Sequence, residues 1–168
     1  DIVGVVLPVR ANAEAVVAAA ESGAKAVFCD KPMTARLSDA DSMVEACERN
    51  GVALAAGVIP RNYPEYWKAN DMVAAGEIGE ITGENVYDPN GQGGCHGINL
   101  ALMFAQDADV EWAVGSVGGD PHSDEDGDGA LQGIGGYFRF TSGIEVFCHT
   151  TAGIRTRAGE SGQGIEVV

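Results

Sequence analysis

Three apolar runs, separated by helical segments, constrain the fold of this sequence more than any other feature. The runs lie at residues 2–9, 24–30 and 52–59, and apolar residues dominate each of them. Strands with one solvated face alternate apolar and polar residues, whereas strands covered on both faces are apolar nearly throughout. The three runs therefore predict central strands of a parallel sheet.

The segments between these runs carry helix signals. Asn12 and Ser38 are candidate N-caps, because short polar side chains can accept hydrogen bonds from the first free N–H groups of a helix. Gly23 and Gly51 fall where the two helices would end, a position that favours glycine. The order strand–helix–strand–helix–strand predicts an α/β fold with a parallel, doubly wound sheet, in which ligands bind at the carboxyl ends of the strands.

The rest of the chain has a different pattern. A third helix is predicted from Pro64 to Gly76, and a buried helix over residues 97–105. The whole second part is expected to be an α+β lobe with a mostly antiparallel, open sheet, and the domain boundary is placed between residues 62 and 63. The strands predicted for this sheet are residues 81–88, 110–117, 130–140 and 144–151.

The charge balance restricts the partners of the protein. The 168 residues carry a formal net charge of −15, which repels phosphate backbones, so nucleic acid is not an expected partner.

No apolar run is long enough to span a bilayer, and the first residues lack the basic leader of a signal peptide, so no membrane association is expected. Reduced thiols and a cytoplasmic location are predicted, because no CxxC spacing occurs among Cys29, Cys47, Cys95 and Cys148.

The clearest chemical signal is Lys31, which directly follows the second apolar run. Its turn, Asp30–Lys31–Pro32, is expected at the ligand edge of the sheet together with Pro8 and Arg61. An ammonium group at that edge can stabilise a developing alkoxide or polarise a carbonyl for hydride attack. The alternative interpretation is an ordinary strand end at the protein surface.

Five segments, in matching order, resemble the Gfo/Idh/MocA family of oxidoreductases. AVFCDKPM resembles the family's strand and Glu-Lys-Pro turn, with Asp30 in place of glutamate. LPVRAN resembles its Thr-Pro-x-x-x-His segment, with Pro8 kept and Asn12 in place of histidine. GVIPRNYPEYWKANDMVAAGEIGEI resembles its Gly-x-x-x-Arg-x-x-Pro stretch and Gly-x-Ile-Gly close, and GGCHGIN its Asp-x-Gly-x-His-x-x-Asp motif. The acidic lead-in and hairpin of residues 124–151 complete a resemblance that covers essentially the whole chain.

This resemblance implies an enzyme that transfers a hydride between NAD or NADP and a secondary alcohol of a sugar, cyclitol or related polyol. It makes residues 1–62 a partial, Rossmann-like dinucleotide-binding domain and residues 63–168 a truncated substrate and oligomerisation domain. It also suggests a homo-oligomer built on the open face of the second sheet. The implied site residues are Lys31 and His96 for catalysis, Pro8, Asn12, Asp30, Lys31 and Pro32 for the cofactor, and Arg61, Gln92 and Asn99 for the substrate.

The sequence also departs from the family pattern. His96 would take the hydroxyl proton, since an imidazole pKa lies near neutrality. Gln92 and Asn99 stand where the family has aspartates, so two negative charges are missing near this base, which lowers its expected basicity. No Gly-x-Gly-x-x-Gly opens a helix, and the family has that fingerprint upstream of the first run. We therefore expect an interior fragment that lacks the dinucleotide fingerprint.

Several features allow two interpretations. His96 is either the base or a capping or core histidine, and Arg61 either binds substrate or braces the two lobes. The acidic residues 124–129 resemble the start of a calcium loop, but a solvated turn is favoured because the later ligands do not match. The family's fold also permits redox-assisted glycoside cleavage or a non-catalytic binding role. Core packing is expected, rather than a place in a sugar site, for Tyr63, Tyr66 and Trp67.

Overall fold

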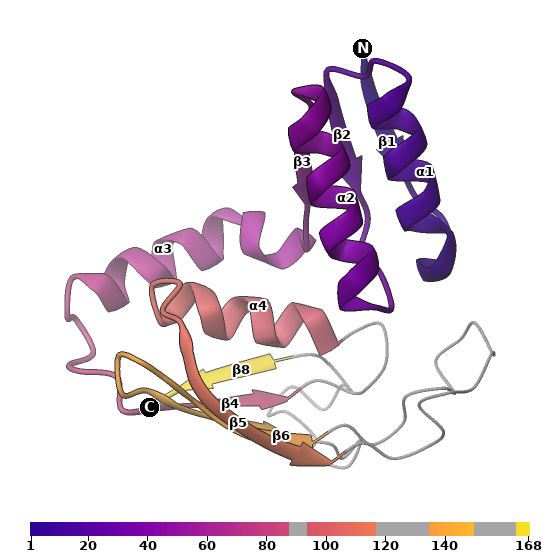
Figure 1. Ribbon diagram of the computed structural model, residues 1–168. Helices are drawn as coiled ribbons and strands as arrows, with labels where there is room; N and C mark the ends of the chain where they lie inside the picture. Colours follow the sequence, from indigo (N-terminus) through magenta and orange to yellow (C-terminus); the bar gives the residue numbers. More distant parts are fainter. Residues whose placement is uncertain (88–93, 117–134, 150–163) are drawn as a thin grey trace. The chain divides into compact units, whose positions relative to one another are not determined.

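The computed structural model of the chain describes residues 1–87, 94–116, 135–149 and 164–168 (Figure 1). The chain divides into two units, Asp1–Val58 and Ile59–Val168. Unit 1 and unit 2, as we call them, each have their own sheet and their own buried core.

Unit 1 is a three-stranded parallel sheet with two helices. Its strands are β1 (Ile2–Val5), β2 (Ala26–Cys29) and β3 (Ala53–Ala56), and they lie side by side in chain order. Helix α1 (Val9–Glu21) connects β1 to β2, and α2 (Leu37–Asn50) connects β2 to β3. The prediction of three parallel strands joined by two helices is confirmed.

Both helices of unit 1 cover the same face of its sheet (Figure 1). Side chains of β1 and β2 alternate accordingly: Val5, Val27 and Cys29 are buried in the core with α1 and α2. Ile2 and Phe28 point to the other face and are exposed. The strands are apolar on both faces, as the sequence indicated, but within the described residues of this unit only one face has a helical cover.

The predicted starts of both helices need correction. Helix α1 begins directly after Pro8, whose φ of −52° and ψ of 138° make it the N-cap, so Asn12 lies inside the helix. Helix α2 begins after Arg36, an extended residue with φ −133°, so Ser38 does not cap it. Neither cap residue forms a side-chain capping bond; the local backbone conformation sets the helix start. The predicted end at Gly51 is confirmed by its left-handed φ of 65°.

In its described residues, unit 2 combines a mixed five-stranded sheet with two α-helices and a short 3-10 helix. The strand order is β5-β6-β7-β4-β8, in which β4 and β7 are parallel and the other three pairs are antiparallel. The predicted α+β lobe is confirmed, and β8 is a strand that the sequence analysis did not predict. The elements are η1 (Ile59–Asn62), α3 (Pro64–Ala74), β4 (Gly83–Tyr87), α4 (Gly94–Phe104), β5 (Val110–Ser116), β6 (Gly135–Phe140), β7 (Glu145–His149) and β8 (Gly164–Val167).

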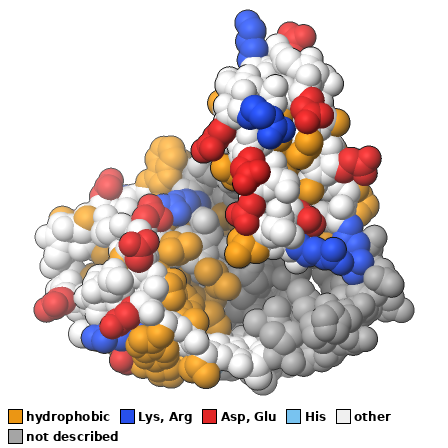
Figure 2. Space-filling model, viewed as in Figure 1, with side chains coloured by type: hydrophobic (Ala, Val, Ile, Leu, Met, Phe, Trp, Pro, Cys, Tyr) orange, Lys and Arg blue, Asp and Glu red, His pale blue; other side chains and the backbone are white. Residues whose placement is uncertain are grey.

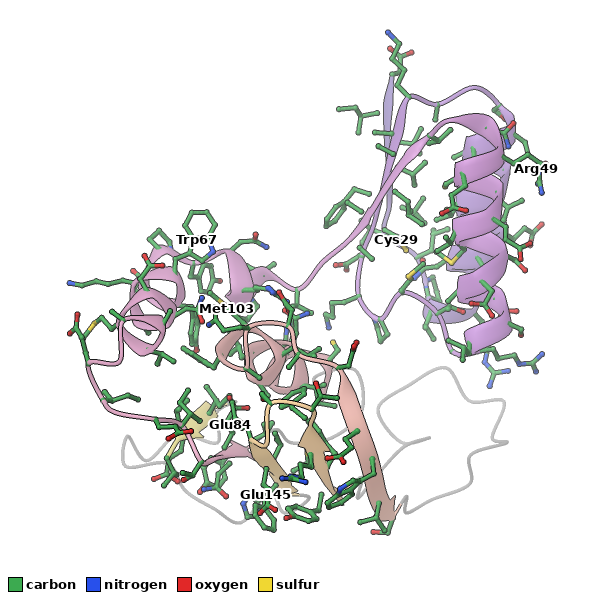
Figure 3. The ribbon with its side chains drawn as sticks, turned by 60° about the vertical axis from the view of Figure 1, so that its left-hand side comes forward. Cys29, Arg49, Trp67, Glu84, Met103 and Glu145 are labelled. Atoms are coloured by element: carbon green, nitrogen blue, oxygen red, sulfur yellow. The ribbon has the colours of Figure 1, made fainter. Side chains whose placement is uncertain are left out.

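Helix α4 packs on one face of the second sheet and builds the core of unit 2. Ala101 in its last turn and Ala105 directly after it lie against Val86, Phe140 and Val146 of the central strands. The opposite face of the sheet carries no helix among the described residues. Figure 3 shows Glu84 and Glu145 on different sides of the sheet, with Glu84 on the side of α4.

Helix α3 exposes its aromatic side chains, which corrects one expectation. Tyr63 and Trp67 are 48% and 53% exposed, so they do not pack in the core, and Tyr66 is half-buried. The helix has no buried residue, and its main contacts among the described elements are with η1 and α4. The Trp67 indole N–H donates instead to the Arg61 carbonyl oxygen at 2.7 Å. Figure 2 shows apolar side chains gathered on the surface of this unit.

Candidate functional site

The Lys31 turn begins where the central strand of unit 1 ends. The Asp30 N–H donates to the Val5 carbonyl oxygen at 2.9 Å, which fixes the start of the turn against β1. Asp30, Lys31 and Pro32 are half-buried, and the Lys31–Pro32 peptide bond is cis. Pro8 is exposed at the carboxyl end of β1. The structure thus places Pro8 and the whole turn at the carboxyl edge of one parallel sheet.

Asn12 reaches this turn from helix α1. Its side chain is only 1% exposed, and its Nδ2 donates to the Pro32 carbonyl oxygen at 3.1 Å. Its Oδ1 is buried and has no hydrogen-bond partner among the described residues. Asn12 therefore contacts the predicted cofactor-binding turn from the core side, and its predicted direct contact with a cofactor stays a prediction.

Cys29 lies under the same turn. Its Sγ is 3.4 Å from the Asp30 carbonyl oxygen and 3.8 Å from that of Met33, and its side chain is fully buried on the helix side of β2 (Figure 3). Burial raises the pKa of this thiol, and the nearby Asp30 carboxylate raises it further. The thiol therefore keeps its proton at neutral pH and can donate it to either of these two carbonyl groups, one at a time.

The second group of candidate residues lies in the first turns of α4. His96 and Asn99 are half-buried and three residues apart, so they share one side of the helix. The Asn99 Oδ1 is buried and has no hydrogen-bond partner within the described part of the chain, so it is an acceptor that a hydroxyl group could satisfy. Gln92 lies outside the described residues. The roles of His96, Gln92 and Asn99 remain predictions.

Arg61 belongs to unit 2, in helix η1, rather than to the sheet of unit 1. Its Nη2 donates to both carboxylate oxygens of Asp107, at 2.6 and 2.5 Å. The residue before Asp107 forms a similar contact: the Gln106 side-chain amide donates to the Asn70 Oδ1 at 2.9 Å. Gln106 and Asp107 both adopt left-handed backbone, with φ of 56° and 55°. Together they fasten η1 and α3 to the end of α4.

We expect Asp107→Asn to lower the free energy of unfolding by about 0.5–1 kcal/mol, because it removes the charge from a half-exposed ion pair. Asparagine also tolerates the left-handed backbone, so the change isolates the charge. Urea unfolding should show the same loss for Arg61→Gln and a smaller loss for both variants at high salt. Unequal losses would contradict a shared ion pair, and a KM increase confined to Arg61→Gln would identify Arg61 as a substrate ligand.

The sequence analysis did not single out Cys29 or Asp107 as contributors to these arrangements. A thiol in an apolar strand and an aspartate after a helix are common, so neither position carries a signal before the fold is known.

Within the described residues, no three His, Cys, Asp or Glu side chains gather closely enough to hold a metal ion. The acidic residues 124–129, for which a calcium loop was weighed against a solvated turn, lie outside the described residues. None of the helices in the described ranges has the length and apolar character needed to cross a bilayer.

Comparisons with known proteins agree with this arrangement. Residues 1–58, which are unit 1, match the family model of the Gfo/Idh/MocA proteins, described as an oxidoreductase family with an NAD-binding Rossmann fold. A 2,7-anhydro-N-acetylneuraminate hydratase of Escherichia coli is 37% identical over 81 residues, which are 48% of this chain and 22% of that protein. An NADP-dependent D-xylose 1-dehydrogenase of Haloarcula marismortui is 35% identical over 80 residues, again 48% of this chain and 22% of that protein.

A solved structure matches both units. The inositol dehydrogenase homolog of Azotobacter vinelandii, complexed with NADH and myo-inositol, superimposes with a TM-score of 0.79 and 20% identity. The match covers 99% of this chain and 48% of that chain, so this chain spans about half the length of its solved neighbour. At this identity the similarity shows a shared fold. The family model and the curated relatives therefore show that unit 1 of this chain is similar to the NAD-binding unit of the Gfo/Idh/MocA family of oxidoreductases.

Proposed function

We propose that the protein is an NAD(P)-dependent oxidoreductase that acts on a secondary alcohol of a sugar, cyclitol or related polyol. The observation that carries this proposal is the position of Lys31, directly after the central strand of a unit that matches an NAD-binding Rossmann model. The names of relatives add the substrate class, since one is a xylose dehydrogenase and another was crystallised with myo-inositol.

The carboxyl edge of unit 1 fits the nicotinamide-ribose part of a dinucleotide. Pro8 is exposed there, and Asp30 and Lys31 are half-buried, so polar and charged groups stand at the ligand edge rather than in the core. We assign Pro8, Asp30, Lys31 and Pro32 to the cofactor side of the site, with Asn12 behind them. When bound, the nicotinamide supplies the acceptor for the hydride.

Residues of this chain then stabilise the charge on the substrate hydroxyl oxygen and accept its proton. Oxidation of a secondary alcohol removes a hydride from carbon and a proton from oxygen, and negative charge develops on that oxygen in between. The Lys31 ammonium stabilises this charge, and His96 accepts the proton. Asn99 and Gln92, which carry no charge, hydrogen-bond to neighbouring hydroxyl groups, and Arg61 contributes to substrate binding from η1.

A substrate panel tests this function. The purified protein is incubated with NAD⁺ or NADP⁺ and with myo-inositol, D-xylose and related polyols, and the absorbance of reduced nicotinamide is followed. We expect reduction of one of the two cofactors with at least one polyol. A protein that binds neither cofactor nor polyol, or binds them without turnover, would contradict the proposal and favour the non-catalytic alternative.

A reaction without net oxidation is the second candidate. The observation that favours it is the relative named as a hydratase, which is 37% identical over the matched segment. In such a reaction transient oxidation assists cleavage or addition, and the cofactor is regenerated in each cycle. The same panel, extended to anhydro sugars and glycosides and followed by chromatography, distinguishes the two, because product would form with no net reduced nicotinamide.

A second copy of the chain is the proposed partner on the open face of the second sheet. Trp112, Tyr137 and Phe147 form an aromatic row there, with ring centroids 4.9 and 4.4 Å apart. Val114 beside them is 63% exposed and Phe147 is 46% exposed. Apolar surface of this kind, on three adjacent strands, favours burial against another protein surface. A cytoplasmic location remains a prediction from the cysteine pattern.

We expect Val114→Glu to reduce the molar mass measured by light scattering after size exclusion, because a buried carboxylate would oppose association. Val44→Glu is the matched control: it places the same charge at an exposed valine of α2 and should leave the mass unchanged. An unchanged mass for Val114→Glu would exclude this face as the interface between copies.

A further inference from the structure

The polar side chain of Asn12 lies inside the apolar core of unit 1. Its amide is 1% exposed, on the same side of α1 as the core residues Val16 and Ala20. A buried amide destabilises a fold unless hydrogen bonds compensate for the lost water. The described partner of this amide is the Pro32 carbonyl, 20 residues further along the chain and directly after Lys31. The amide therefore links α1 to the turn rather than to its own helix.

Cys29 supports the same turn from the strand side. Its buried Sγ contacts the carbonyl oxygens of Asp30 and Met33, so three of the four carbonyls from Asp30 to Met33 lie against a buried side-chain atom, either the Asn12 Nδ2 or the Cys29 Sγ. We call Asn12 and Cys29 the turn brace. Surface turns usually leave such carbonyls to water, which permits the backbone to shift. The brace instead ties the backbone on both sides of Lys31 to the rigid sheet and helix.

We propose that Asn12 is a positioning residue, whose buried amide holds the Pro32 carbonyl and thereby fixes the location of Lys31 at the carboxyl edge of the sheet. This inference rests on the proposed function, in which the Lys31 ammonium stabilises the developing alkoxide. A reacting group displaced by about 1 Å loses on the order of 100-fold in rate, so the accuracy of this placement matters for turnover. The substrate itself would still bind, because Asn12 does not touch it.

Hydrogen exchange tests the brace without requiring activity. Asn12→Leu removes the donor while keeping a side chain of similar volume, and Asn12→His restores a ring N–H that can donate. We expect amide exchange in the peptide of residues 29–36 to be about 10-fold faster in Asn12→Leu and close to the parent rate in Asn12→His. The control is Val16→Ala, one turn along α1, which weakens the same core without touching the turn.

Kinetics test the consequence for Lys31. With myo-inositol or D-xylose as substrate, Asn12→Leu should lower kcat about 10-fold or more while KM changes by less than about 3-fold. Val16→Ala should change neither constant. If Asn12→Leu does not fold, Asn12→Ala replaces it, with the same two measurements.

The outcomes separate this inference from the function on which it rests. Exchange and kcat that change no more in Asn12→Leu than in Val16→Ala would overturn the positioning role, while the proposed function would stand if Lys31→Met loses turnover. Full turnover in Lys31→Met would overturn the proposed function. In that case the exchange measurement still decides whether Asn12 holds the turn.

Discussion

Replacing Lys31 with methionine is expected to lower kcat by about 100- to 1,000-fold, the usual effect of removing one electrostatic donor from a developing oxyanion. Methionine keeps the length of the side chain and removes only the ammonium group. KM should change much less, because the charge acts on the alkoxide, which forms after binding. Steady-state kinetics with NAD⁺ or NADP⁺ and the polyol found in the substrate panel measure both constants.

Lys25 provides a matched control for this variant. It lies directly before β2, at the opposite end of the strand from the Lys31 turn, and its side chain is exposed. Lys25→Met therefore removes the same charge at the edge of the sheet away from the turn. We expect kcat and KM to stay at parent values in Lys25→Met. Lys31→Arg should restore little activity, since a planar guanidinium does not place its charge where an ammonium does. Equal kcat in Lys31→Met and the parent would show that the catalytic role of Lys31 is wrong.

Much of unit 1 could be predicted from the sequence because its signals are local. Apolar runs of strand length define β1, β2 and β3, and Gly51 ends α2 through its left-handed backbone. Lys31 follows one of those runs, so its place at the carboxyl edge follows from parallel topology alone. The same reasoning could not show that Asn12 is buried. A polar residue near a predicted helix start looks like an N-cap, and only the tertiary contact with Pro32 explains it.

Unit 2 was harder to predict, for reasons that concern burial rather than secondary structure. Tyr63 and Trp67 are apolar enough for a core, yet α3 has too few neighbours to cover them. Arg61 was expected at the sheet edge of unit 1, but it forms an ion pair with Asp107. That ion pair depends on the left-handed backbone of Gln106 and Asp107, for which the sequence contains no signal. Glu84 was not singled out at all, because a glutamate in a strand is expected to face solvent.

Glu84 gives the protein a strong expected dependence of stability on pH. It lies on β4, on the same side as the core residue Val86, and it is 1% exposed. Among the residues that the structure describes, neither of its carboxyl oxygens has a hydrogen-bond partner. Burial without a compensating partner raises the pKa of this carboxyl from 4.5 to about 8. In the folded protein at neutral pH, Glu84 therefore holds a proton and is uncharged.

The direction of the pH effect follows from proton binding. Between about pH 4.5 and about pH 8 the unfolded chain has released this proton and the folded protein has kept it. The folded state therefore binds more protons, so the free energy of unfolding falls as pH rises through this window, by at most about 1.4 kcal/mol per pH unit. Below the window both states are protonated and Glu84 contributes no slope.

Glu84→Gln should remove this slope, because glutamine stays neutral at every pH. We expect the variant to be close to the parent near about pH 4.5 and more stable by several kcal/mol near about pH 8, after allowance for one buried amide without a partner. Urea unfolding followed by circular dichroism across this range measures the difference. Glu80→Gln, an exposed carboxyl ahead of the same strand, is the control for overall charge and should keep the slope of the parent. A Glu84→Gln variant with the parent's slope would show that Glu84 is ionised in the folded protein, and hence that water or a counter-charge reaches it.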